Sequence, residues 1–147
     1  MQYQKRKDIF KYYSVDYTPD YTEEMDTEGL KVLKWSMFDT PEQLGSGKMF
    51  MESAPVFILD KIFKTERLTG FIELGYTSKA YADRTRLASD HPHRLGKGVK
   101  FRCLSKEKRF TLVKGLIQYG IQRIHLYEES IYFDTDNYIR KPEIVII

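Results

Sequence analysis

The chain has a single cysteine, Cys103, which excludes an internal disulfide and a zinc finger built on spaced cysteines. Long apolar runs are also missing, and the longest, such as residues 54–59, fall far short of the roughly 20 residues that span a bilayer. We therefore expect no membrane span, and no apolar run follows the basic N-terminus to indicate a secretory signal. The chain also lacks a large excess of either charge, since it has 24 Lys and Arg and 21 Asp and Glu. A net charge of +3 makes nucleic acid an unfavourable partner.

What is present is typical of one folded domain: 147 residues, of which 41% are hydrophobic and 14% aromatic. Residues 1–28 differ from the rest, because basic residues come first, acidic ones follow, and neither helical nor alternating periodicity is sustained. Five of the eleven tyrosines lie there: Tyr3, Tyr12, Tyr13, Tyr17 and Tyr21. We interpret this stretch as an arm, which is either a solvated tail or strap, or a segment that binds a protein partner, since tyrosine is enriched at interfaces.

Residues 29–147 predict an α+β domain, with a small, mostly antiparallel sheet and helices near 54–67 and 105–119 packed on one side of it. Apolar residues at helical spacing define the inward faces: Val56, Leu59, Ile62 and Phe63 in the first helix, and Phe110, Val113, Leu116 and Ile117 in the second. Strands are expected at 71–74, 99–103, 121–127, 130–133 and 143–147. Residues 39–47 predict a turn region, and 79–98 a long irregular loop.

Four segments together resemble a known family. They are residues 33–49, which read LKWSMFDTP and then GSGKM, residues 72–78 (IELGYTS), residues 93–100 (HRLGKGVK), and residues 123–134, which close with SIYFD. Their order and spacing are similar to those of the zinc D-alanyl-D-alanine carboxypeptidases and endolysins that cut the peptides of bacterial peptidoglycan, and whose fold is shared with the hedgehog signalling domain. The resemblance implies that peptidase fold for residues 29–147, and a bacteriophage source.

The same resemblance implies that the zinc site has been lost. The family's first histidine ligand falls on His93, its aspartate ligand on Lys100 and its second histidine ligand on Tyr132. An ammonium has no electron pair to donate to a cation, so Lys100 is incompatible with the family's metal site. The family's turn arginine falls on Thr77, which has no charge to supply, and Asp134 is left as a remnant of the site.

Two structural alternatives remain open for this site. Zinc is retained if His91 and His93 are joined by His125 or Cys103, although the four are explained more simply as polar loop residues (His91 and His93), a solvent-facing strand residue (His125) and a small buried residue (Cys103). Without metal, Lys100 either pairs with Asp134 beside a hydrogen bond from Tyr132, or points into solvent while side chains fill the former pocket.

The sequence therefore supports three functions. The first is a noncatalytic relative of the wall peptidases without cofactor, acting as a structural or binding component in or on a phage particle. The second is an active zinc-dependent murein peptidase with rearranged ligands. The third is a module that binds peptidoglycan peptides without cutting them. The sequence leaves localisation open between the virion and the host cytoplasm.

Overall fold

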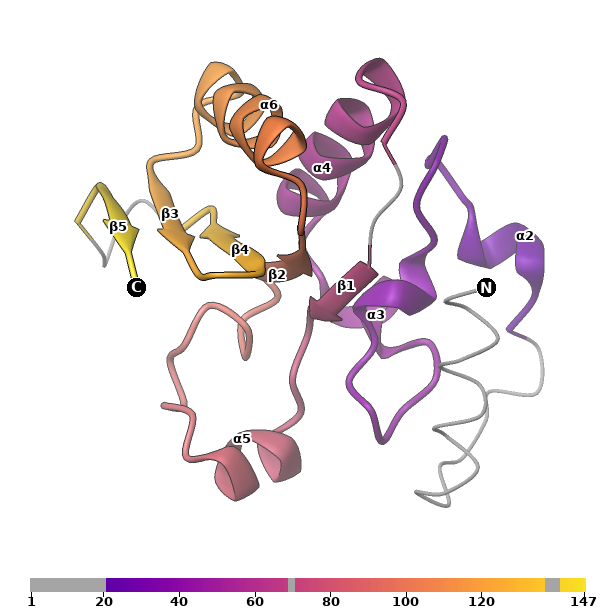
Figure 1. Cartoon of the computed structure of the whole chain (residues 1–147). Coiled ribbons are helices and arrows are strands. Elements are labelled where there is room, and N and C mark those ends of the chain that lie inside the picture. The colour runs from indigo at the N-terminus through magenta and orange to yellow at the C-terminus, as the bar shows by residue number, and fades with distance from the viewer. Residues whose placement is uncertain (1–20, 69–70, 137–140) are drawn as a thin grey trace.

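The computed structural model describes residues 21–68, 71–136 and 141–147. The helices, one of them a 3-10 helix (η1), are α2 (Glu23–Asp26), η1 (Trp35–Phe38), α3 (Ser46–Phe50), α4 (Ser53–Thr65), α5 (Lys79–Thr85) and α6 (Lys106–Gln118). The strands are β1 (Phe71–Leu74), β2 (Gly98–Arg102), β3 (Arg123–Leu126), β4 (Ser130–Asp134) and β5 (Glu143–Ile146). Figure 1 shows their arrangement.

The strands form one five-stranded sheet in the order β1-β2-β4-β3-β5. Its pairs are antiparallel except β3 with β5, which is parallel. The expected strands and the mostly antiparallel sheet are therefore confirmed, within a residue or two at their ends. All five residues of β4 are buried, because this central strand is covered on both faces of the sheet.

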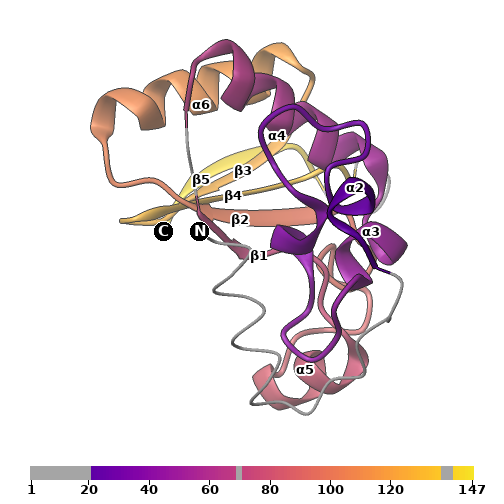
Figure 2. The same ribbon diagram turned by 90° about the vertical axis from the view of Figure 1, so that its right-hand side faces the viewer.

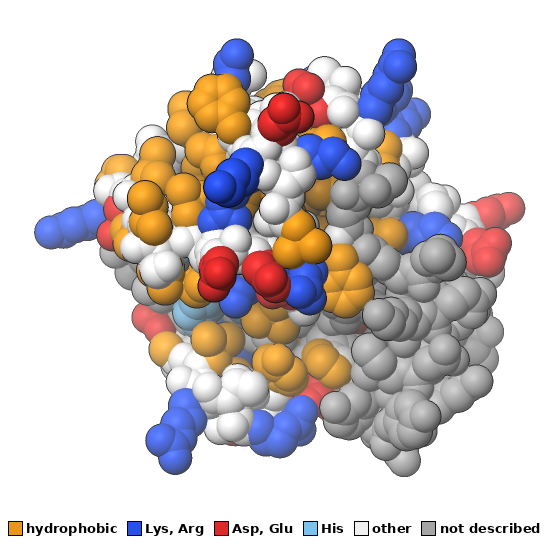
Figure 3. Space-filling model, in the orientation of Figure 1, with side chains coloured by type: hydrophobic (Ala, Val, Ile, Leu, Met, Phe, Trp, Pro, Cys, Tyr) orange, Lys and Arg blue, Asp and Glu red, His pale blue; other side chains and the backbone are white. Residues whose placement is uncertain are grey.

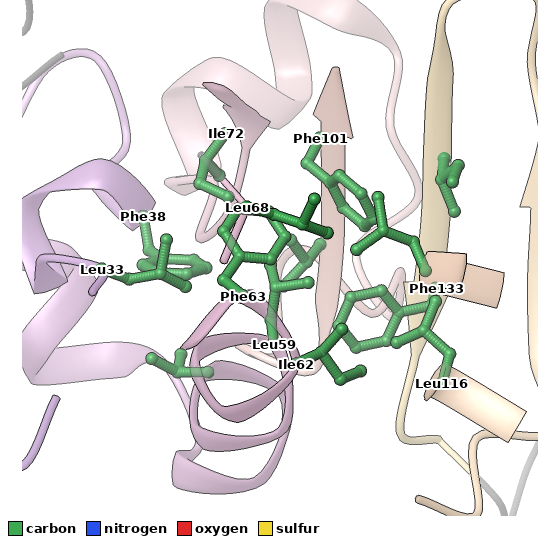
Figure 4. Packing of buried hydrophobic residues seen from close by; sticks show 14 of the residues in the cluster. Leu33, Phe38, Leu59, Ile62, Phe63, Leu68, Ile72, Phe101, Leu116 and Phe133 are labelled. Carbon is green, nitrogen blue, oxygen red and sulfur yellow. The ribbon is translucent and has the colours of Figure 1, made fainter. Parts of the chain in front are cut away.

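The two long helices lie on the same face of the sheet, as expected. Figure 2 shows α4 and α6 above the sheet and α5 below it. The apolar side chains of β2 and β4 that alternate toward these helices are Val99, Phe101, Ile131 and Phe133, all fully buried. They pack with the predicted face of α4 (Figure 4), where Phe63 meets Phe101 edge to face with ring centroids 5.9 Å apart.

The predicted inward face of α6 is partly wrong. Leu116 is buried, but Phe110 and Ile117 are 71% and 48% exposed, and the second buried residue of the helix is Leu112. The helix faces α4 through the Leu112–Leu116 side because Gly115 lies against Ile62, where an added Cβ would be 3.2 Å from that side chain. The spacing of apolar residues does not reveal that Gly115 lies at the contact with α4, so the sequence pattern predicted the wrong buried face for α6.

Two segments expected to be irregular contain helices. The loop predicted at 79–98 begins with α5, which Ser78 caps by accepting a hydrogen bond from Tyr81 N–H at 3.1 Å. The turn predicted around 45–47 instead starts α3, with Gly45 in the left-handed conformation before it. Both helices are too short to show a helical period in the sequence.

The end of the predicted arm contacts the domain. Asp26 of α2 is buried, and its carboxylate accepts hydrogen bonds from Ser36 N–H (2.6 Å), from the Ser36 hydroxyl (2.8 Å) and from the Tyr21 hydroxyl (3.0 Å). The other four arm tyrosines, Tyr3, Tyr12, Tyr13 and Tyr17, lie outside the described residues, so partner binding by the arm stays a prediction. Across the described ranges, no helix has the length and hydropathy needed to cross a membrane.

Candidate functional site

A pocket of about 300 Å³ opens on the face of the sheet opposite α4 and α6. Three of its residues form one row across the strands, because Lys100 of β2 pairs with Tyr132 of β4, which pairs with His125 of β3. Their side chains share a face since each alternates with a core residue on its strand. The pocket is lined by Leu74, Leu87, His91, Pro92, His93, Lys100, Arg123, His125, Tyr127 and Tyr132.

The structure brings together the three positions that the resemblance equates with zinc ligands. His93, Lys100 and Tyr132 all line this pocket, although they come from a loop and two strands. The ring of Tyr132 lies 5.3 Å from that of His93. Asp134 is fully buried behind the pocket wall and accepts a hydrogen bond of 2.7 Å from the Tyr132 hydroxyl.

His93 is held as a neutral imidazole. Its Nδ1 lies 2.8 Å from the Gly75 carbonyl oxygen and 3.2 Å from that of Gly98, so Nδ1 carries the proton and Nε2 keeps its lone pair. Burial, with a smaller contribution from neighbouring His91, lowers the pKa of His93 to about 4, although the two backbone hydrogen bonds oppose the shift. The His91 ring stacks on it, with centroids 5.0 Å apart.

The partner of Asp134 is Arg123, so the first of the two alternatives, a Lys100–Asp134 pair, is wrong. Arg123 Nε lies 3.1 Å from Asp134 Oδ2, and its Nη1 lies 3.1 Å from Glu143 Oε1, which also contacts His125 Nε2 at 2.9 Å. Burial disfavours the charge on Arg123, but the hydrogen bond and the charge of Asp134 outweigh it, and the pKa of Arg123 is raised. Arg123 reaches Asp134 because β3 and β4 place these two residues directly opposite each other.

Lys100 stays at the pocket wall, with its side chain 30% exposed. Its ammonium lies 4.1 Å from the centre of the Tyr127 ring and 3.9 Å from Glu73 Oε2. The alternative that it points freely into solvent is therefore also wrong. Sequence reasoning missed Tyr127, Glu73 and Arg123; the alternation of β3 was the one signal that would have placed Arg123 beside His125.

Thr77 lies next to the pocket without lining it. Its N–H donates to the His93 carbonyl oxygen at 3.1 Å, and its own carbonyl oxygen accepts from Arg94 at 2.9 Å. Its hydroxyl is buried and makes no hydrogen bond within the described residues. The position that the resemblance assigns to a charged arginine is thus occupied by an uncharged residue whose backbone, and not its side chain, binds to the segment around His93.

The donor atoms present do not fit the family's zinc. His93 has the free Nε2 and the backbone-held Nδ1 of a metal ligand, but Lys100 presents an ammonium and Tyr132 a hydroxyl already donated to Asp134. Nor does the alternative set assemble, because Cys103 is buried in a separate hollow with Phe63 and Leu112. Over residues 21–68, 71–136 and 141–147, no three His, Cys, Asp or Glu side chains are placed to hold one ion.

Comparisons with family models, with curated proteins and with solved structures found no match for this chain. Its family resemblance therefore stays a prediction, and the pocket has to be judged on its own chemistry. The polar side chains that line it are ring nitrogens, phenols, one ammonium and one guanidinium, without a carboxylate among them. Such a surface can donate hydrogen bonds to a polar ligand and stack against it.

Proposed function

We propose that this chain is a noncatalytic relative of the D-alanyl-D-alanine peptidases that binds peptides of the bacterial cell wall through the pocket, as a component of a phage particle. One observation carries the proposal: His93, Lys100 and Tyr132, the positions of the family's three zinc ligands, meet in one pocket, and only one of them offers a free lone pair. That these three residues meet in one pocket favours membership of the family. That only one of them can donate a lone pair to zinc disfavours hydrolysis.

The binding role is supported by the openness and the lining of this pocket. Peptides present carbonyl oxygens and a terminal carboxylate, which are acceptors for the Lys100 ammonium, and backbone N–H groups, which can donate to the lone pair on His93 Nε2. Asp134 binds both Arg123 and the Tyr132 hydroxyl, and these contacts hold the wall of the pocket in place. Because the charge of Arg123 is already paired, Lys100 is the cation left to bind a ligand. The carboxylate nearest Lys100 is 3.9 Å away and is also bound to Ser130, which leaves the ammonium available.

Metal content tests the loss of the zinc site. The purified chain, incubated with zinc and desalted, is expected to retain well under one equivalent by elemental analysis. The double variant Lys100→Asp, Tyr132→His is expected to gain one zinc, because it restores the family's ligand set around His93. Adding His93→Ala to the double variant is the matched control and should abolish the gain. One zinc per wild-type chain, or cleavage of muropeptides that chelators stop, would contradict the proposal and favour the rearranged peptidase.

Binding is tested separately by sedimentation with purified peptidoglycan. Wild-type protein is expected to co-sediment, and Lys100→Met is expected to weaken binding, since it keeps the length of the side chain and removes its charge. Lys79→Met is the control, because Lys79 is exposed on α5 and lies outside the pocket. Equal sedimentation of all three proteins would place binding elsewhere on the chain and overturn the role given to the pocket.

A further inference from the structure

One edge strand of the sheet, β1, is covered by the rest of the chain, whereas the outer side of the other, β5, is not covered by any described strand. Beside β1, the chain itself provides cover, because η1 packs there, Tyr76 N–H donates to the Phe38 carbonyl oxygen at 2.8 Å, and Gly75 allows the backbones to touch. A Cβ at Gly75 would lie 2.6 Å from Phe38 Cα. At the other edge, β5 pairs with β3 alone among the described strands.

The backbone of β5 directs hydrogen-bonding groups away from the sheet. Glu143 N–H donates to the carbonyl oxygen of Gln122, the residue before β3, and Ile147 N–H donates to the carbonyl oxygen of Leu126 at the end of β3. Because successive residues of a strand point their N–H and C=O groups to opposite sides, those of Ile144 and Ile146 face outward. The outer edge of β5 therefore offers two donors and two acceptors in the spacing of a sheet ladder.

The side chains on this edge are apolar and uncovered. Ile144 is 55% exposed and Ile146 83% exposed, although they lie on the same face of the sheet as the core residue Ile124. Figure 3 shows hydrophobic side chains gathered on the left of the molecule, where Figure 1 places β3 and β5. Natural edge strands are usually protected by Lys or Pro, and neither occurs in β5.

We propose that β5 pairs with β5 of a second copy of this chain, antiparallel and about a two-fold axis through Val145, so that the two sheets become continuous. In this register Ile144 forms a hydrogen-bonded pair with Ile146 of the second copy, and Val145 lies opposite Val145 of the second copy. Each exposed isoleucine is then covered by its counterpart. Two-fold symmetry requires the edge to match itself, and this one does.

Charge is compatible with the same pairing. Glu143 is the only charged residue of β5, and the register places it at the end of the pair, opposite Ile147 of the second copy. Its carboxylate is already bound by Arg123 and His125 of its own chain. No like charges therefore meet within the paired strands. The inference rests on the sheet edge and is independent of the function proposed for the pocket.

The mass of the full chain in solution is the first test. Light scattering during gel filtration is expected to give twice 17.4 kDa at micromolar and higher concentrations. Ile146→Lys is expected to give the single-chain mass, because a lysine protects an edge strand, while the fold is checked by circular dichroism. Phe110→Lys is the control: this residue is exposed on α6, away from the edge, and the variant should remain a dimer. A single-chain wild type, or a dimeric Ile146→Lys, would overturn the proposal.

Crosslinking tests the register. Residues that face each other in a non-hydrogen-bonded antiparallel pair have Cα atoms about 4.5 Å apart, within the range of roughly 4.4–6.8 Å that a disulfide needs. Val145→Cys is therefore expected to form a covalent dimer rapidly on mild oxidation. Ile144→Cys, whose thiols are offset along the strands, should form it at least tenfold more slowly. Wild type provides the background, since Cys103 is buried. Equal rates for the two variants would refute this register and the two-fold axis at Val145.

Discussion

The ion pair between Arg123 and Asp134 gives a sharp test of how the pocket wall is held. Both side chains are buried: that of Asp134 completely, that of Arg123 to all but 10%. The Asp134 carboxylate also accepts hydrogen bonds from the Tyr132 hydroxyl at 2.7 Å and from Asp136 N–H at 3.1 Å. Asp134→Asn keeps the shape but removes the charge, and turns an amide donor toward groups that are themselves donors.

The magnitude follows from what remains around Arg123. Removing one partner of a buried pair costs about 3–5 kcal/mol, because the other charge is left buried without compensation. Arg123 would keep Glu143 and the Lys141 carbonyl oxygen, at 3.1 and 2.8 Å, so we place the cost for Asp134→Asn near the lower end, at about 3 kcal/mol. Glu143→Gln is the matched control and should cost clearly less, since that side chain is 41% exposed and solvent screens its charge.

Urea denaturation followed by circular dichroism measures both values. For a small domain a loss of about 3 kcal/mol lowers the unfolding midpoint by roughly 1–3 M urea. The two variants are compared with wild type at pH 7, where carboxylates are ionised. If Asp134→Asn lost no more stability than Glu143→Gln, the buried pair would not be what holds β3 to β4 at the pocket, and the pocket wall would not owe its rigidity to this pair.

Two further predictions concern the histidine at the pocket and the faces of α6. Because burial lowers the folded pKa of His93 to about 4 from 6.5, the unfolded chain binds the proton first, and stability is lost as pH falls from 6.5 toward 4. Between pH 7 and pH 5 this loss is about 2 kcal/mol, measured by urea unfolding, and His93→Gln should remove that share of the pH dependence. On α6, Leu116→Ala should cost about 2–5 kcal/mol and Phe110→Ser less than about 0.5 kcal/mol. The reverse order for α6, or an unchanged pH dependence in His93→Gln, would count against these assignments.

Much of the fold was predictable because its signals are local. The strands at 71–74 and 130–133 and the face of α4 follow from the period of apolar residues, which depends only on backbone geometry. The short helices α3 and α5 were missed because a single cap and five to seven residues carry little periodic signal. The face of α6 was misplaced because its contact with α4 depends on the small size of Gly115.

Some members of the site were predictable from the sequence, but their interactions were not. Resemblance to a family predicted His93, Lys100 and Tyr132 as one group, and they line one pocket. It did not predict that Asp134 binds Arg123, since that choice depends on the register between β3 and β4 and on the position of each side chain relative to its neighbours.

From the residues alone came the two long helices, the strands, the mostly antiparallel character of the sheet and the incompatibility of an ammonium with a zinc ligand, because each depends on a side chain's own chemistry or on spacing along the chain. Only the tertiary structure determined that Asp134 pairs with Arg123, how deeply His93 is buried, and that β5 is the edge strand left uncovered. These properties come from residues distant in sequence that strand pairing brings to within a few ångströms, where burial and charge change how each group behaves.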